Sequence, residues 1–214
     1  MKIALIGATG FVGSAVLAEL LNRHHQVTVL ARTPGKLTPA PGLTVVQADA
    51  QDANAVAQAV QGQDAVVSAY NPGWAVPDLH DQFLKGARAI VSGVKASGVK
   101  RLLVVGGAGS LFVAPGVQLV DTPEFPAEWK QGALAARQAL AELQTESALD
   151  WTFVSPPIFL EPGERTGHYR LGGNTPLEAA TGGPARISTA DLAVAIVDEL
   201  ETSRHVRQRF TVGH

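Results

Sequence analysis

Short apolar stretches alternate with amphipathic stretches along the whole of this 214-residue chain. The apolar stretches are rich in valine, leucine and isoleucine, which is typical of strands buried on both faces of a parallel sheet. They lie at 2–6, 27–30, 43–47, 65–69, 101–105, 151–155 and 209–212. Apolar residues at helical spacing predict helices between them, at 11–21, 54–60, 79–97, 127–146 and 189–201. This alternation predicts the α/β fold class, as a single doubly wound parallel-sheet domain over 1–214.

The first predicted strand runs directly into a glycine-rich turn that opens the first helix. Glycine permits a tight turn, lets the backbone approach a pyrophosphate, and lets the helix pack closely on the strand. The free N–H groups and positive dipole end of the helix then face the phosphates. Glycines also serve in purely structural turns, but the strand, helix and second strand in succession favour a dinucleotide site. The residues predicted to bind the cofactor here are Gly7, Thr9, Gly10, Phe11, Val12 and Gly13.

The second predicted strand is followed by a basic segment that bears on the choice of cofactor. An acidic residue at this point would accept hydrogen bonds from a ribose 2′-hydroxyl and repel a 2′-phosphate, whereas an arginine attracts that phosphate. Arg32, Thr33 and Lys36 stand here. They therefore favour NADP(H) over NAD(H), the alternative being that Arg32 and Lys36 are ordinary surface charges.

Two later strand ends supply further candidates for the cofactor site. Asp49 and Ala50 follow the third predicted strand, where the carboxylate of Asp49 can meet the adenine amino group. An aspartate before a helix is also a routine turn or capping residue, and the sequence leaves both interpretations open. Ala69 and Tyr70 close the fourth strand, at the edge where the ribose and nicotinamide are expected.

Composition removes several other classes of function. The formal net charge is −2 and the chain has no cysteine, so neither nucleic acid, nor an anionic membrane surface, nor a thiolate site is expected. The first apolar run is too short for a signal peptide or membrane span, which predicts a soluble cytoplasmic protein. The six histidines are scattered without ligand spacing, so no metal site is expected, and His24 and His25 are predicted to be solvated turn residues.

Five motifs carry a resemblance to a known family. They read GATGFVG at 7–13, GGAGSL at 106–111, LDWTFVSPP at 149–157, PGERTGHYRLG at 162–172 and ISTADLAVAIVDELE at 187–201. In these the chain resembles the atypical short-chain dehydrogenase/reductase superfamily, and within it the branch of small NAD(P)-binding proteins labelled NADH-flavin reductases. The resemblance implies a cofactor contact at Pro156 and Pro157, and Gly107 is assigned to the same site. It also implies a substrate-side flap within 156–188, whose glycine-rich part at 163–173 is predicted to be hairpin-like.

The acid that many carbonyl-reducing members of this superfamily use is missing from the sequence. Those enzymes pair a tyrosine with a lysine four residues later, so that the tyrosine can donate a proton to the developing alkoxide. Tyr70 is followed at that spacing by Trp74, and Tyr169 by Gly173. Ser110 matches the superfamily's serine after the fifth strand, although a structural serine in a glycine-rich loop is the competing interpretation. The catalytic candidates are therefore Ser110 and Tyr169, with Tyr70, Trp74 and His80 as further candidates to line the site.

Hydride transfer to an acceptor that needs no strong local acid fits this pattern. A flavin or a quinone delocalises the incoming charge, and solvent completes its protonation. The sequence therefore predicts an NADPH-dependent reductase of a small flavin or quinone-like acceptor, with flavin as a possible substrate. A non-catalytic NADP(H)-binding sensor is the alternative, and nucleotide-sugar epimerase or dehydratase chemistry is the third, weakened by the short region after Pro157. Alanine-rich helical surface makes a homodimer plausible.

Overall fold

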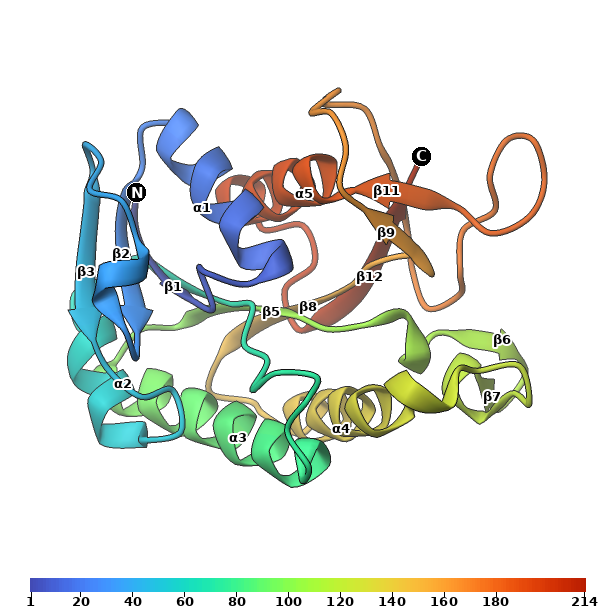
Figure 1. Cartoon of the computed structure of the whole chain (residues 1–214), viewed down its shortest axis with the longest axis horizontal. Helices are drawn as coiled ribbons and strands as arrows, with labels where there is room; N and C mark the ends of the chain where they lie inside the picture. Colours follow the sequence, from blue (N-terminus) through green and yellow to red (C-terminus); the bar gives the residue numbers. More distant parts are fainter.

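The computed structural model describes the whole chain, Met1 to His214, and centres on one mostly parallel sheet. Its strands are β1 (Lys2–Ile6), β2 (Gln26–Ala31), β3 (Leu43–Gln47), β4 (Ala65–Ser68), β5 (Arg101–Val105), β8 (Asp150–Ser155), β10 (Arg170–Gly172) and β12 (Gln208–Gly213). Across the sheet they lie in the order β10-β12-β8-β5-β4-β1-β2-β3 (Figure 1). The order reverses between β1 and β4, which is the switch point where doubly wound folds bind dinucleotides. The predicted Rossmann-like fold class is confirmed.

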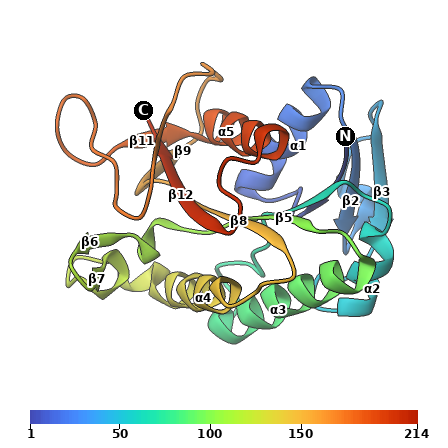
Figure 2. The same ribbon diagram turned by 180° about the vertical axis from the view of Figure 1, so that it is seen from behind.

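Helices cover both faces of this sheet. On one face lie α1 (Phe11–Asn22) and α5 (Thr189–Thr202); on the other lie α2 (Ala53–Val60), α3 (Leu79–Ser97) and α4 (Ala127–Gln144), and the two views agree on this (Figures 1 and 2). Strand β1 shows why two layers form, because Ile3 and Leu5 belong to the core under α1 and α5, whereas Ala4 and Ile6 belong to the core under α2, α3 and α4. Alternate side chains of a strand point to opposite faces, so a continuously apolar strand requires a cover on each side.

The ends of the helices follow local chemistry. The side chain of Ser188 accepts a hydrogen bond from the backbone N–H of Asp191 at 2.9 Å and so caps α5, as predicted. Helix α3 closes at Gly98, whose φ of +83° is the left-handed conformation that glycine adopts without a Cβ penalty. Helix α2 is capped by Asp52, whose carboxylate accepts from the N–H groups of Asn54 and Ala55; the sequence interpretation had considered Asp49 for this role instead.

Short elements lie at the carboxyl edge of the sheet, the edge at which the parallel strands end. They are η1 (Pro34–Lys36), η2 (Ala108–Ser110) and η3 (Leu119–Asp121), the hairpin of β6 (Phe112–Ala114) with β7 (Val117–Gln118), and the parallel pair β9 (Phe159–Glu161) and β11 (Arg186–Ser188). The predicted hairpin at 163–173 is wrong. Strand β10 instead pairs antiparallel with β12 and extends the central sheet. The backbone N–H and C=O groups of β12 would otherwise be unpaired at the edge of the sheet, and β10 supplies their partners.

One of the two histidines predicted to be solvated is buried. His25 is 7% exposed, and its ring nitrogens lie 3.0 Å from the carboxylate of Glu201 and 3.2 Å from the N-terminal amine. His24 is exposed, as expected, with a φ of +61°. The difference arises because α5 packs on α1 and brings Glu201 to the turn, a contact between residues 176 positions apart.

Candidate nucleotide-binding site

The turn between β1 and α1 has the geometry of a phosphate cradle. Gly7 has a φ of +87°, and a Cβ at this position would lie 2.3 Å from the carbonyl oxygen of Ala69. A Cβ at Gly13 would lie 2.0 Å from the carbonyl oxygen of Gly7. No side chain caps α1 at Gly10, so the N–H groups of the first helical turn remain available to an anion. The residues present therefore fit a dinucleotide pyrophosphate.

A cleft of about 140 Å³ extends from this turn across the ends of β1 and β2. It is the space that the adenosine half of a dinucleotide occupies in folds of this type. The structure brings eight of the predicted cofactor residues together here. They are Gly7, Thr9, Arg32, Thr33, Lys36, Asp49, Ala50 and Tyr70.

The charges around the cleft suit an anionic ligand. The side chains of Arg32 and Lys36 are exposed on the same wall, and neither makes an ion pair or side-chain hydrogen bond within the protein. Asp49 is exposed on the cleft too, and its carboxylate accepts a hydrogen bond from the backbone N–H of Gln51 at 2.9 Å. Asp49 thus makes an aspartate turn and also faces the cleft, so the two interpretations of this residue are compatible.

Tyr70 forms the wall of the cleft at the end of β4 and is held by a polar network. The amide of Gln51 donates to its hydroxyl at 3.0 Å, and that hydroxyl donates to the backbone oxygen of Gln82 at 3.1 Å. Burial raises the pKa of Tyr70, so its proton is retained. Sequence reasoning missed Gln51 and Asn71 as lining residues. Their place directly after the ends of β3 and β4 was the available signal.

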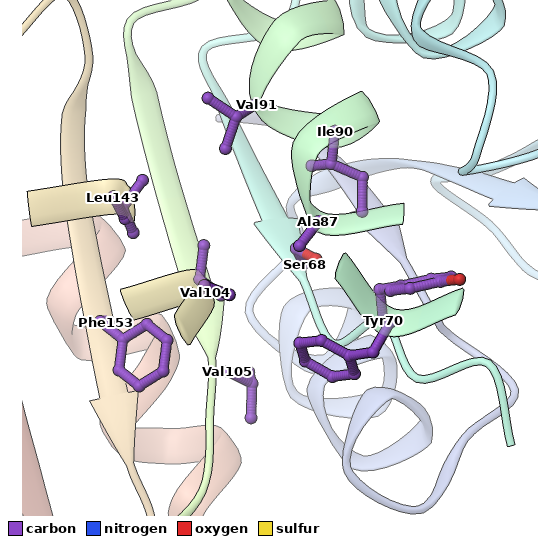
Figure 3. Close-up of a pocket in the computed structure, with 11 residues that line it drawn as sticks. Ser68, Tyr70, Ala87, Ile90, Val91, Val104, Val105, Leu143 and Phe153 are labelled. Carbon is purple, nitrogen blue, oxygen red and sulfur yellow. The ribbon is translucent and has the colours of Figure 1, made fainter. Parts of the chain in front are cut away.

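A second, apolar cavity lies behind Tyr70 between the sheet and helices α3 and α4. Figure 3 shows Tyr70 on one side of it, with side chains of α3, β5 and β8 around it. Its volume is about 30 Å³, room for roughly two waters at 10–15 Å³ each. It is too small for an acceptor ring and belongs to the core that supports the tyrosine.

Ser110 does not face the cleft. It is 2% exposed in η2, where its hydroxyl accepts a hydrogen bond from Nη1 of Arg209 at 3.1 Å and its carbonyl oxygen accepts a second at 2.6 Å. The same guanidinium donates to the amide oxygen of Asn174 through Nε at 3.0 Å. Burial lowers the pKa of Arg209, which has no carboxylate partner. The geometry therefore gives Ser110 a structural role, fixed by two residues that the sequence did not single out.

Tyr169 is also remote from the cleft. Its hydroxyl donates to the carboxylate of Asp198 on α5, and burial together with that hydrogen bond raises its pKa. Just before it, Arg165 pairs with Glu19 of α1 at 2.7 Å, and the backbone N–H of Gly167 donates to Asp191 of α5 at 2.7 Å. Residues 162–169 are thus a strap across α1 and α5, and the structure does not bring Tyr169 to Ser110.

The remaining predicted residues lie on neighbouring strand ends. Gly107 follows β5, and Pro156 and Pro157, both buried, follow β8, the strand beside β5. Gly10, Phe11, Val12 and Gly13 start α1, and the backbone N–H of Ala69 donates to Ile6 at 2.9 Å beside the glycine turn. None of these lines the adenosine cleft, so their contact with a cofactor stays a prediction.

The chain has no helix long and apolar enough to cross a membrane, and no group of three or more histidine and carboxylate side chains gathers as a metal site would require. A Burkholderia pseudomallei structure, 45% identical over all of both chains with a TM-score of 0.88, is described as a putative exported protein. The cytoplasmic location, the homodimer and the exclusion of nucleic acid stay predictions.

Comparison with known proteins places the chain in a family. A family model described as NAD(P)H-binding matches residues 7–203. The Bacillus subtilis protein YwnB is 40% identical over 99% of this chain and 98% of its own length. A Bacteroides thetaiotaomicron structure described as a putative epimerase is 43% identical over 100% and 96% of the two chains, with a TM-score of 0.92. A Streptococcus pneumoniae structure described as a putative NADH-flavin reductase is 34% identical over 100% and 99%, with a TM-score of 0.88. The chain therefore belongs to the NAD(P)H-binding family of atypical short-chain dehydrogenases/reductases.

Proposed function

We propose that the protein is an NADPH-dependent reductase that passes a hydride to a planar acceptor, a flavin or a quinone. The observation that carries this proposal is the state of the two tyrosines. Both hydroxyls are engaged, Tyr70 with Gln82 and Tyr169 with Asp198, and the pKa of each is raised, whereas a catalytic tyrosine needs a lowered one. The Streptococcus pneumoniae relative, by its description, supports the same class of acceptor.

The residues of the chain would bind and orient the cofactor. The glycine turn from Gly7 to Gly13 would hold the pyrophosphate on the first N–H groups of α1. Arg32 and Lys36 would pair with the 2′-phosphate that distinguishes NADPH, because neither has another partner. When bound, the cofactor supplies the hydride, which carries two electrons and one proton.

An acceptor with a delocalised ring system removes the need for a protein acid. The hydride forms one new bond on the flavin or quinone, the charge spreads over the ring, and a proton from solvent completes the two-electron reduction. A carbonyl substrate instead concentrates charge on one oxygen and requires a donor within hydrogen-bond reach. The protein then contributes by holding the acceptor in position against the cofactor.

The test is NADPH oxidation, followed by the loss of absorbance of the reduced nicotinamide, with FMN, FAD or a soluble benzoquinone added to the purified protein. We expect turnover that depends on the protein and on the acceptor. Tight NADPH binding with no turnover on any of these acceptors would overturn the reductase and favour the NADP(H)-binding sensor. Binding is therefore measured separately, by calorimetry.

A further inference from the structure

Several of the large apolar side chains that the protein leaves exposed lie on segments that follow the carboxyl ends of the strands. Phe11 begins α1, Trp74 lies between β4 and α3, and Phe159 begins β9. In Figure 1, α1 and β9 lie on one side of the sheet, and the loop after β4 runs to α3 on the other. Exposed aromatic groups of this kind mark binding surfaces more often than scattered single residues do.

Trp74 differs from the others because hydrogen bonds hold its loop in place while its side chain stays largely exposed. The side chain of Asn71 accepts a hydrogen bond from the N–H of Gly73 at 2.8 Å, and the N–H of Val76 donates to the carbonyl of Gly73 at 3.3 Å. Gln82, which holds Tyr70, also donates through its amide to Asp78 at the other end of the loop, at 2.8 Å. Trp74 is nevertheless 61% exposed.

The indole of Trp74 rests on a glycine, Gly132, in the second turn of α4. A Cβ at Gly132 would lie 2.7 Å from Cζ3 and 3.2 Å from Cη2 of the indole, so no other residue allows this contact without displacing the ring. Glycine is the least favourable residue after proline in a helix interior. The chain thus gives up helix stability at the position that seats an exposed tryptophan.

We propose that Trp74 is a preorganised stacking platform for the aromatic ring system of the acceptor. The inference rests on the proposed function, because it assumes an acceptor at the nicotinamide end of the cleft. Its loop follows β4, which lies beside β1 on the side away from β2 and β3, so the platform stands on the side of the switch point where the nicotinamide half is expected. A rigid indole with an exposed face binds a planar ring with little loss of conformational freedom.

Gly132→Ala tests the platform without touching Trp74 itself. Alanine favours the helix, so α4 is expected to remain folded, while the added methyl group displaces the indole. We expect the Michaelis constant for FMN to rise about tenfold in both Gly132→Ala and Trp74→Ala, since aromatic stacking and ring burial contribute on that scale. The turnover number at saturating FMN and the dissociation constant for NADPH should not change.

Trp129→Ala is the matched control, because Trp129 lies in the first turn of α4, the helix that contains Gly132, and is 50% exposed. An equal rise in this variant, or no rise in the two platform variants, would overturn the proposal. A measurement of FMN binding tests the Trp74 platform separately from the reductase activity. The buried Trp151 also emits, so the additional quenching by FMN in the Trp129→Phe protein relative to the Trp74→Phe/Trp129→Phe protein, both with NADP⁺ bound, reports on Trp74. Quenching without turnover would support the platform and contradict the reductase. Turnover without quenching would support the reductase and contradict the platform.

Discussion

Replacing Arg32 by alanine should separate the two nicotinamide cofactors. The Arg32 side chain lies exposed on the wall of the cleft and has no ion-pair or hydrogen-bond partner in the protein. Its removal therefore leaves no group unsatisfied, and stability should change by no more than about 0.5 kcal/mol. Any loss in affinity can then be assigned to the ligand.

The size of the loss follows from the chemistry of the contact. A hydrogen bond to a charged group contributes roughly 1.5–3 kcal/mol, and about 1.4 kcal/mol is a factor of ten in affinity. Because Lys36 lies on the same wall and retains part of the attraction, Arg32→Ala should weaken NADPH about tenfold and the double variant with Lys36→Ala about a hundredfold. NADH lacks the 2′-phosphate, so its affinity should stay within about twofold.

Calorimetric titration of both cofactors with the wild type and the two variants measures this directly. The preference for NADPH in the wild type should also weaken as salt is raised, because the two cations are exposed and screened. Equal losses for NADPH and NADH, or no loss for NADPH, would refute the assignment of Arg32 and leave it an ordinary surface charge.

Three further changes probe other parts of the molecule. Gly13→Ala should abolish binding of either cofactor while the protein stays folded, because its Cβ would lie 2.0 Å from the carbonyl oxygen of Gly7; calorimetry showing retained binding would contradict the cradle. Glu19→Gln should lower the free energy of unfolding by roughly 1.5–3 kcal/mol, because Glu19 accepts charged hydrogen bonds from Arg165 and Arg23. The hydrogen bond from Arg165 lowers the pKa of Glu19, so this stabilisation is present above pH 4.5 and is lost as the pH falls through the lowered value. Urea unfolding should therefore show a smaller acid-dependent loss in the variant than in the wild type, because other carboxylates with a lowered pKa remain in both. Asp52→Ala removes the cap of α2 and should cost about 1 kcal/mol in the same urea assay, with NADPH affinity unchanged.

The cofactor half of the site was predictable because its geometry is local. The glycine turn, Arg32 and Asp49 each follow the end of a strand, and parallel strands place all such ends at one edge. Sequence position alone therefore puts these residues together. The same logic would have included Gln51 and Asn71.

The surroundings of the two catalytic candidates could not be predicted in this way, because distant residues determine where their side chains point, and their catalytic roles stay predictions. Ser110 follows β5 as expected, but its hydroxyl is turned to Arg209, 99 positions later. Tyr169 is drawn to α5 by Asp198 rather than to the cleft, and His25 is buried by Glu201. Pairings of this length have no periodicity or spacing that a single sequence reveals.

The long-range contacts also bear on which reactions the fold permits. A carbonyl reductase must present a proton donor beside the nicotinamide, and both tyrosine hydroxyls of the chain donate within the protein, Tyr70 to Gln82 and Tyr169 to Asp198. Ser110 differs from the tyrosines, because its hydroxyl accepts a hydrogen bond from Arg209 and is shielded from solvent by burial rather than by donation to a protein group. Its position in η2, at 2% exposure, is what separates this hydroxyl from a ligand in this structure. These contacts support the proposed class of acceptor, one that takes its proton from solvent, and selection of that acceptor by shape and stacking belongs to the same proposal.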